Sequence, residues 1–271
     1  MNLRNQHALI TGGSSGIGKA LAVLLAGRGA HVSLMARNAT RLEDAAAEVR
    51  GAKAYRDQRV LTFSADVSDR NQVEDAVRKI IRDQGVPDLL VTCAGMIHPG
   101  RFMDLPPGVS ERTMEVNYFG TLYTIRAALP SMVRRKRGRL VLISSGAGLI
   151  GIYGYTAYSP SKFALRGLAE CLRGELRQYG IGVSIVYPPD TDTPQLSKEN
   201  RIKPFETRLI TGAARTRSPQ MVARTILKGI RKRSFVITPG FEMTLLFRLH
   251  SILAPLAERY FDYRIALRSR G

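Results

Sequence analysis

The chain has 271 residues, enough for one α/β domain with an extension, and 44% of them are hydrophobic. With 25 glycines and no low-complexity tract, this composition excludes a disordered chain and favours a globular enzyme. The two cysteines, Cys93 and Cys171, lack any paired or metal-ligand spacing, so we expect a reducing compartment, no disulfide framework and no metal. A strand pattern starts by His7 without an apolar leader, so we expect a cytoplasmic protein.

The net charge is +19, from 41 Lys and Arg against 22 Asp and Glu. Residues 201–271 hold 15 of the basic and 4 of the acidic residues, so +11 of the charge lies there. Such a surface suits nucleic acid, anionic lipid or a phosphorylated cofactor. The second basic cluster, at 134–139, is interpreted as a solvated turn. Because no aromatic residues interleave with it, we expect no nucleic-acid partner.

Short runs rich in Val, Ile and Leu alternate with helical patterns along the chain. This rhythm predicts an α/β fold, a doubly wound parallel sheet of about seven strands covered by helices on both faces. The segment from 188 to about 218 breaks the rhythm, since it is long, polar and rich in proline, and it is interpreted as a lid. The expected strands are 7–11, 31–36, 60–64, 88–92, 139–144, 182–187 and 234–238, and expected helices include 19–28, 71–84 and 161–179.

A glycine-rich turn follows the first strand and opens the first helix. Glycines there permit a tight turn and let a pyrophosphate approach the N–H groups of the helix N-terminus. Between a strand and a helix, such a turn predicts a dinucleotide site. The cofactor-binding residues expected in it are Gly12, Ser14, Ser15, Gly16, Ile17 and Gly18.

The end of the second strand indicates which dinucleotide binds. NAD sites typically place a carboxylate there for the ribose hydroxyls. This chain has Arg37 instead, with Arg41 one helical turn further on. A guanidinium can bind a 2′-phosphate through two hydrogen bonds, so the sequence favours NADPH.

Tyr158 and Lys162 lie four residues apart in a helical pattern and therefore on one helix face. A cation beside a phenol lowers its pKa, so the pair could serve as an acid and base at neutral pH. On a solvated helix this spacing also arises by chance. How strongly the pair indicates an active site depends on the residues around it.

Taken together, residues 5–240 resemble the short-chain dehydrogenase/reductase family. The matching motifs are Thr11–Gly18, Asp66-Val67, Cys93-Ala94-Gly95, Asn117, Ser144-Ser145 and Tyr158 to Lys162. The resemblance implies a Rossmann fold, in which Asp66 and Val67 flank the adenine and residues 93–95 lie beside the cofactor. Asparagine is usual at position 93, so Cys93 is a departure that loses a side-chain hydrogen bond.

The resemblance also implies a catalytic tetrad for carbonyl reduction. Tyr158 would donate a proton to the carbonyl oxygen, and Lys162 would lower its pKa and hold the nicotinamide ribose. Ser145 would orient the carbonyl, with Ser144 as the adjacent alternative lining the cofactor side. Asn117 would sit at a helix distortion and relay protons through water to Lys162. Hydride chemistry would belong to the cofactor.

The segment after the sixth strand is a second departure, because Pro189 replaces the usual glycine and stiffens the turn. Pro188, Thr191 and Thr193 are expected at the cofactor, Thr193 at its carboxamide. The run 187–194 and the residues up to 210 resemble the branch of the family that reduces long-chain sphingoid ketones with NADPH. That resemblance implies 3-ketodihydrosphingosine as substrate and a lid over about 190–217. A 3-oxoacyl thioester or hydroxysteroid, or a noncatalytic NADPH- or nucleic-acid-binding role, stays open.

The domain is expected to span 1–240, and residues 241–271 form a predicted amphipathic helical extension. Its stripe is too short and too interrupted to span a bilayer. Two interpretations stay open: packing in a homodimer or homotetramer, or peripheral contact with an anionic membrane on its cytoplasmic face. The stripe is Phe241, Leu245, Leu249, Ile252, Leu256, Tyr260, Tyr263 and Leu267, flanked by Arg248, Arg259, Arg264, Arg268 and Arg270.

Overall fold

The computed structural model describes residues 3–212, 215–249, 255–256, 259–260 and 263. Its centre is a seven-stranded parallel sheet in the order β3-β2-β1-β4-β5-β6-β7. The chain winds outward from β1 to β3 and then crosses to β4 on the other side of β1, which creates a crevice at the carboxyl ends of these strands. The strands are β1 His7–Thr11, β2 His31–Ala36, β3 Val60–Ser64, β4 Leu89–Thr92, β5 Gly138–Ile143, β6 Ile181–Val186 and β7 Val236–Ile237.

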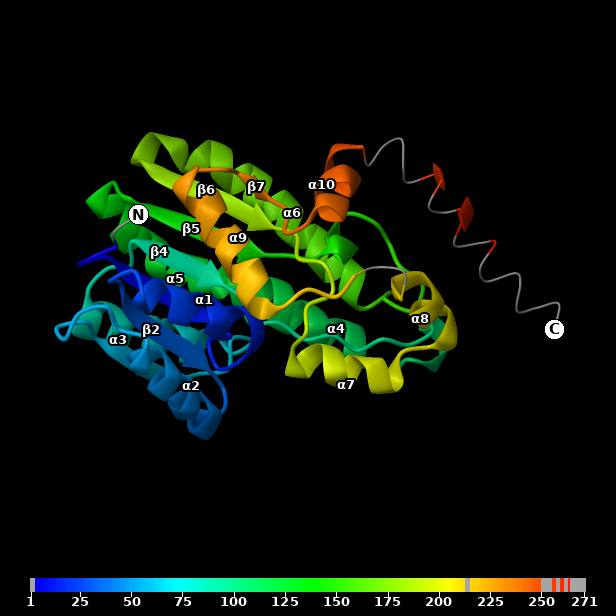
Figure 1. The fold of residues 1–271 in the computed structure, drawn as a ribbon, viewed down its shortest axis with the longest axis horizontal. Helices are drawn as coiled ribbons and strands as arrows, with labels where there is room; N and C mark the ends of the chain where they lie inside the picture. Colours follow the sequence, from blue (N-terminus) through cyan, green and yellow to red (C-terminus); the bar gives the residue numbers. More distant parts are fainter. Residues whose placement is uncertain (1–2, 213–214, 250–254, 257–258, 261–262, 264–271) are drawn as a thin grey trace.

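Helices cover both faces of the sheet (Figure 1). Alternate side chains of β1 enter two separate cores, Ile10 on one face and Leu9 on the other, as period-two strands require. Helices α1, α2 and α9 pack on the Ile10 side, and α3, α5 and α6 pack on the Leu9 side. The helices are α1 Gly16–Ala26, α2 Ala39–Gly51, α3 Arg70–Gln84, α4 Val109–Met114, α5 Gly120–Arg135, α6 Tyr158–Glu175, α7 Pro194–Ile202, α8 Phe205–Thr211, α9 Pro219–Arg231 and α10 Phe241–Arg248.

The predicted doubly wound fold is confirmed, and most element boundaries fall within one residue of expectation. The seventh strand is shorter than predicted, because only residues 236 and 237 of the edge strand pair with β6. The sixth helix starts earlier than predicted, at Tyr158. Tyr158 and Lys162 therefore occupy its first two turns, at the end of the sheet where the crevice lies.

The segment after β6 is more regular than predicted, because it contains α7 and α8. Pro194 occupies the first turn of α7, where its missing N–H costs no hydrogen bond, and the Thr193 hydroxyl caps that helix by accepting from Leu196 N at 3.2 Å. Pro204 is the N-cap residue of α8. The prolines therefore start helices here, and the lid is helical rather than irregular.

The C-terminal extension begins with α10, which packs onto the domain. The Phe247 ring stacks on Tyr187 with centroids 5.8 Å apart, and the Met243 side chain lies against Gly146. No helix in the described ranges is both long and apolar enough to cross a membrane. Of the predicted stripe and its basic flanks, Ile252, Leu267, Arg264, Arg268 and Arg270 lie outside the described residues.

Candidate active site

The glycine turn after β1 lies directly against the end of β4. Gly12 has a φ of +68°, which favours glycine, and a Cβ there would lie 2.7 Å from the Ala94 backbone nitrogen. Thr11, the last residue of β1, holds the two segments together, because its hydroxyl accepts from Cys93 N at 3.1 Å and Ala94 N at 3.2 Å. In the sequence, Thr11 stands out only as part of the glycine-rich turn. The structure adds that its hydroxyl joins the end of β1 to the residues after β4.

The N-terminus of α1 offers a binding site for an anion. Ser15 is the extended N-cap, but its side chain makes no capping hydrogen bond, so the N–H groups of Gly16 and Ile17 point out of the helix end without a side-chain acceptor. Ser14 is half-buried and Ser15 is exposed beside them. Free N–H groups and the helix dipole suit a pyrophosphate at this position, so the residues present fit a dinucleotide.

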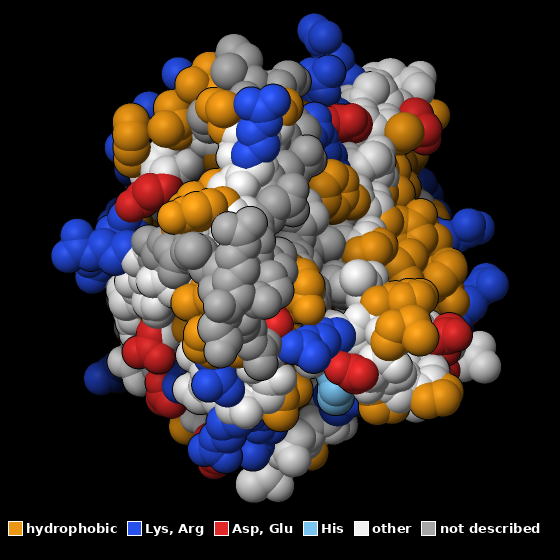
Figure 2. Space-filling model, turned by 90° about the vertical axis from the view of Figure 1, so that its right-hand side faces the viewer, with side chains coloured by type: hydrophobic (Ala, Val, Ile, Leu, Met, Phe, Trp, Pro, Cys, Tyr) orange, Lys and Arg blue, Asp and Glu red, His pale blue; other side chains and the backbone are white. Residues whose placement is uncertain are grey.

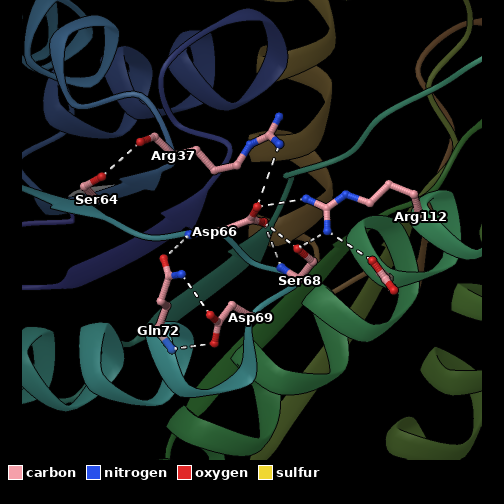
Figure 3. A network of polar contacts seen from close by, with 8 residues as sticks. Arg37, Ser64, Asp66, Ser68, Asp69, Gln72 and Arg112 are labelled. Carbon is pink, nitrogen blue, oxygen red and sulfur yellow. Dashed lines mark hydrogen bonds and ion pairs between the residues drawn. The ribbon is translucent and has the colours of Figure 1, made fainter.

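Asp66, which is expected at the adenine, belongs to the polar network of Figure 3. Arg37 is exposed, and its guanidinium approaches the Asp66 carboxylate at 3.8 Å. Burial raises the pKa of Asp66, but hydrogen bonds from Ser68 and Arg112 outweigh this and hold its pKa below the ordinary value. Arg37 is therefore oriented but only loosely paired, which leaves its guanidinium available to a phosphate. Arg41 is exposed in the first turn of α2.

Arg112 was not predicted as a site residue. It extends from α4 and donates to Asp66 at 2.9 Å and to the Ser68 hydroxyl at 2.6 Å, while also pairing with Glu115 at 3.1 Å. Arg112 thus connects the expected adenine pocket, where Val67 is buried, to the helix that leads to Asn117. Nothing in its sequence context marks it, because its partners lie 44 and 46 residues away.

Asn117 lies on the expected helix distortion, the π-helix Glu115–Phe119 between α4 and α5. Its side chain is buried and fully engaged: Oδ1 accepts from Met96 N at 2.8 Å, and Nδ2 donates to Met96 O at 3.0 Å and to Ser161 Oγ at 2.8 Å. Asn117 therefore joins the end of β4 to α6. Its role in a water relay stays a prediction.

Tyr158, Ser145 and Lys162 come together beneath the lid. Burial raises the pKa of the Tyr158 phenol, and a hydrogen bond with Ser145 opposes this rise. Lys162 is also buried, which lowers its pKa to about 8; its Nζ donates to Ile143 O at 3.1 Å and lies 5.6 Å from the centre of the Tyr158 ring. The expectation of a lowered phenol pKa is therefore wrong: the pKa is raised, and burial is the largest cause. The phenol is protonated at neutral pH, as a proton donor must be.

Ser144 and Ser145 differ in what their hydroxyls contact. Ser144 is buried, and its hydroxyl donates to the Lys162 carbonyl at 2.9 Å, so it anchors α6. Ser145 is half-buried, accepts from Ala147 N at 3.2 Å and reaches Tyr158. The geometry therefore favours Ser145 over Ser144 as the residue that orients a carbonyl.

Three more of the predicted cofactor residues directly follow β4. Cys93, Ala94 and Gly95 are half-buried there, and burial raises the pKa of the Cys93 thiol to about 11. The thiol accepts a hydrogen bond from the Gly18 backbone, so it replaces part of what an asparagine would contribute. It stays neutral at physiological pH and is a packing residue, not a nucleophile.

The turn after β6 carries the other predicted cofactor residues. Pro188 is buried and its carbonyl accepts from Gly146 N at 3.0 Å, next to Ser145. Thr191 donates to Pro189 O at 2.8 Å, and the Thr193 side chain packs against Gly16. The structure thus brings the turn, the glycine loop and Ser145 together. The carboxamide role of Thr193 stays a prediction.

A buried network under the lid was missed at the level of sequence. The Tyr155 hydroxyl donates to the Glu199 carboxylate, and the Tyr155 ring packs edge-to-face on Tyr158 with centroids 5.6 Å apart. Lys203 pairs with Glu199 at 2.8 Å and with Asp190 at 3.7 Å. The Thr207 hydroxyl of α8 donates to Tyr153 O at 2.8 Å, so α8 also contacts the loop that precedes α6. The i,i+4 spacing of Glu199 and Lys203 was the available signal, but it normally marks a solvated helix face.

A dinucleotide crevice at the strand ends and a buried phenol beside a lysine define a nicotinamide-dependent oxidoreductase. The chain belongs to the short-chain dehydrogenase family, whose model matches residues 6–203.

Relatives with named activities extend the match over nearly the whole chain. It is 44% identical over 255 residues to the 3-ketodihydrosphingosine reductase of Bos taurus, covering 94% of this chain and 77% of the bovine protein. It is 40% identical over 247 residues to a 3-dehydrosphinganine reductase of Arabidopsis thaliana, covering 90% of this chain and 74% of that protein. Among solved structures, levodione reductase superposes with a TM-score of 0.80 at 25% identity, over 89% of this chain and 98% of that one. The family and this neighbour imply a nicotinamide cofactor.

Proposed function

We propose that this protein reduces the 3-keto group of 3-ketodihydrosphingosine, with NADPH as the hydride source. The observation that carries the proposal is the similarity to reductases of this ketone, which runs beyond the common fold and includes the whole lid. NADPH is supported by Arg37, which stands at the end of β2 with its guanidinium exposed. The reduced nicotinamide supplies a hydride to the carbonyl carbon when bound.

The residues of the chain account for the proton transfer to the carbonyl oxygen. Ser145 and Tyr158 would hydrogen-bond the carbonyl oxygen, and Tyr158 would release its proton as negative charge develops there. Lys162, with its pKa lowered to about 8, retains its positive charge in neutral solution and stabilises the tyrosinate left behind. The lid network holds Tyr155 against the buried ring of Tyr158.

The test is NADPH oxidation by the purified full chain in detergent micelles that contain 3-ketodihydrosphingosine. Parallel reactions with a long-chain 3-oxoacyl thioester and a 3-ketosteroid decide between lipid ketones. We expect turnover with the sphingoid ketone and at least tenfold lower kcat/KM with the others. Turnover of the thioester without turnover of the sphingoid ketone contradicts the proposal.

We further propose peripheral contact with an anionic membrane through the lid end of the molecule. Phe102 is 71% and Met103 is 88% exposed, next to Arg101, which pairs with Glu206 of α8 at 2.8 Å. Phe205, beside Glu206, is also exposed. Figure 2 faces this end of the molecule and shows hydrophobic side chains gathered along one side, with Lys and Arg among and around them. Apolar side chains with basic neighbours suit a bilayer that contains anionic lipid.

Flotation with vesicles of anionic or neutral lipid tests this contact. The variant Phe102→Ser/Met103→Ser should float less with anionic vesicles than the unmodified chain. Tyr55→Ser, at an exposed aromatic residue between α2 and β3, is the matched control and should float normally. Equal flotation of all three proteins contradicts a contact at this end. The homo-oligomeric state stays a prediction.

A further inference from the structure

The buried network under the lid has an unbalanced charge. It contains two carboxylates, Asp190 and Glu199, and one ammonium, that of Lys203, which lies 3.7 Å from the first and 2.8 Å from the second. Buried charges are normally matched by a partner of opposite sign. One carboxylate therefore has capacity for a further cation.

Asp190 is the member with that capacity. The side chain of Lys203 is 2% exposed and that of Glu199 is 7% exposed, whereas that of Asp190 is 31% exposed. Glu199 already accepts from both Tyr155 and Lys203. Within the described part of the chain, the Asp190 carboxylate has only the longer pair with Lys203.

Asp190 is also connected to the reacting groups. Its carboxylate and that of Glu199 both contribute to the raised pKa of Tyr158. Its backbone is fixed on both sides, because Pro188 O accepts from Gly146 N at 3.0 Å and Asp190 O accepts from Arg217 N at 2.9 Å. The Asp190 carboxylate is therefore carried on the turn that contacts Gly146, next to Ser145, and it is connected to Tyr158 through Lys203, Glu199 and Tyr155.

This location matches the substrate of the proposed function, on which the inference rests. 3-Ketodihydrosphingosine carries an amine on the carbon next to its keto group. Amines of this type titrate near ~8, so the group is mostly an ammonium at neutral pH. When the keto oxygen contacts Tyr158, the ammonium lies two bonds from the carbonyl carbon, within the reach of a carboxylate at the rim of the site. Acyl thioesters and steroids have no such cation.

We propose that Asp190 binds the substrate ammonium and so selects amino ketones over other lipid ketones. Glu199 and Lys203 act as positioning residues, because they hold the lid and the Asp190 carboxylate in place. Lys203 keeps Glu199 neutralised, which leaves the Asp190 charge for the substrate. A charge-assisted hydrogen bond of this kind fixes which face of the ketone is presented as well as adding affinity.

The experiment compares Asp190→Asn with the unmodified protein on two ketones in the same micelles. One is 3-ketodihydrosphingosine, and the other is the hydroxyketone of the same chain length without the amine. We expect the substitution to raise KM for the amino ketone ten- to hundredfold, with a smaller change in kcat, and to change kcat/KM on the amine-free ketone by no more than about twofold. Asp190→Glu should restore part of the lost selectivity. Asp192→Asn is the matched control on the same turn, where the side chain is exposed.

The outcomes separate this inference from the proposed function. If the unmodified protein does not turn over the amino ketone, the proposed function fails. If it does, and Asp190→Asn behaves like the unmodified protein, Asp190 does not bind the amine. An equal loss on both ketones assigns Asp190 to holding the lid and likewise overturns the inference.

A second measurement needs no variant and stands even if Asp190→Asn fails to fold. The unmodified protein is inhibited with the long-chain amino alcohol product and with the same diol lacking the amine. The amine should inhibit at least tenfold more tightly at pH 7, and this preference should shrink at pH values where the amine is neutral. Equal inhibition by the two compounds contradicts the inference.

Discussion

Ser145 and Tyr158 share a hydrogen bond between their hydroxyls at the start of α6, although burial raises the pKa of the phenol. The serine hydroxyl opposes that rise, and Ser145 itself is only half-buried. A carbonyl oxygen placed between the two hydroxyls would receive both hydrogen bonds. The pair is thus arranged to stabilise negative charge that develops on that oxygen.

Replacing Tyr158 by phenylalanine should remove the proton donor while keeping the ring that packs on Tyr155. General acid catalysis typically contributes ~10²- to 10⁴-fold, so we expect kcat to fall by about that factor. NADPH oxidation gives the rate, and quenching of NADPH fluorescence gives cofactor affinity, which should change little. Tyr123→Phe, on α5, is the control and should retain full activity. A Tyr158→Phe enzyme with normal kcat would exclude Tyr158 as the donor.

Lys162 makes stability depend on pH with a defined sign. Its pKa is lowered from 10.5 to about 8 in the folded protein, so the unfolded chain binds more protons between these values. The free energy of unfolding therefore rises with pH across that window, and the penalty for burying the ammonium is complete below about pH 8. From pH 8 to pH 9 this amounts to about 1 kcal/mol.

Urea denaturation of the unmodified protein and of Lys162→Met at pH 8 and pH 9 measures how much Lys162 contributes to this change in the free energy of unfolding. The unmodified protein should gain about 1 kcal/mol more than the variant between the two values. Because the Cys93 thiol, whose pKa is raised to about 11, is present in both proteins, its opposite effect cancels in the difference. Parallel pH dependence in the two proteins would mean that Lys162 keeps its proton in the fold.

The sequence predicts the sheet well, and it names the residues that the fold brings together around Tyr158, since both depend on local patterns. The short apolar runs that become β1, β2 and β3 give those strands at their observed bounds, and the spacing of Ser145, Tyr158 and Lys162 follows from one strand and one helix. Arg112 and the Tyr155–Glu199 contact were missed, because each joins segments 44 or more residues apart. Their residue types are ordinary on solvated helices. Only the tertiary fold shows that Glu199 is buried.

The sequence also led to the wrong direction for the pKa shift of Tyr158, which is raised and not lowered. The i,i+4 spacing implies a cation near the phenol, which lowers its pKa, and the structure does place Lys162 beside the ring. The larger effect is desolvation by the surrounding lid and sheet, which no local pattern reports. Burial acts on both partners, so it raises the pKa of Tyr158 and lowers that of Lys162.

Arg37 should set the preference for NADPH. Arg37→Gln removes the guanidinium at the end of β2 without placing a second carboxylate beside Asp66. We expect the Kd of NADPH to rise ten- to hundredfold, the range of a charge-assisted contact of ~1.5–3 kcal/mol, while the Kd of NADH stays within about twofold. Calorimetric titration of both cofactors measures the ratio. Arg28→Gln, an exposed arginine beyond the C-terminal end of α1, should leave both constants unchanged. If Arg37→Gln weakened the binding of NADPH and NADH equally, Arg37 would not be the residue that contacts the 2′-phosphate.

Gly154 lies in the loop before Tyr158 and faces Thr207 and Pro204 of the lid. Its replacement should therefore loosen the lid and leave the cofactor-binding part of the fold in place. Its φ is +80°, and a Cβ there would collide with the Thr207 hydroxyl and lie 3.3 Å from Pro204 Cγ. Gly108 has the same φ of +80° with nothing within 4 Å of such a Cβ, so Gly108→Ala is the matched control. Both variants should lose roughly 1 kcal/mol of stability from the left-handed backbone.

Only Gly154→Ala should also displace α8 from the loop. We expect KM for the lipid ketone to rise at least fivefold in that variant, with NADPH affinity kept, because the glycine turn at α1 is untouched. Hydrogen exchange should be faster over residues 205–211 in Gly154→Ala than in Gly108→Ala, since Thr207 no longer reaches Tyr153 O. A matching rise in KM for Gly108→Ala would mean that lost stability, not the lid contact, weakens substrate binding.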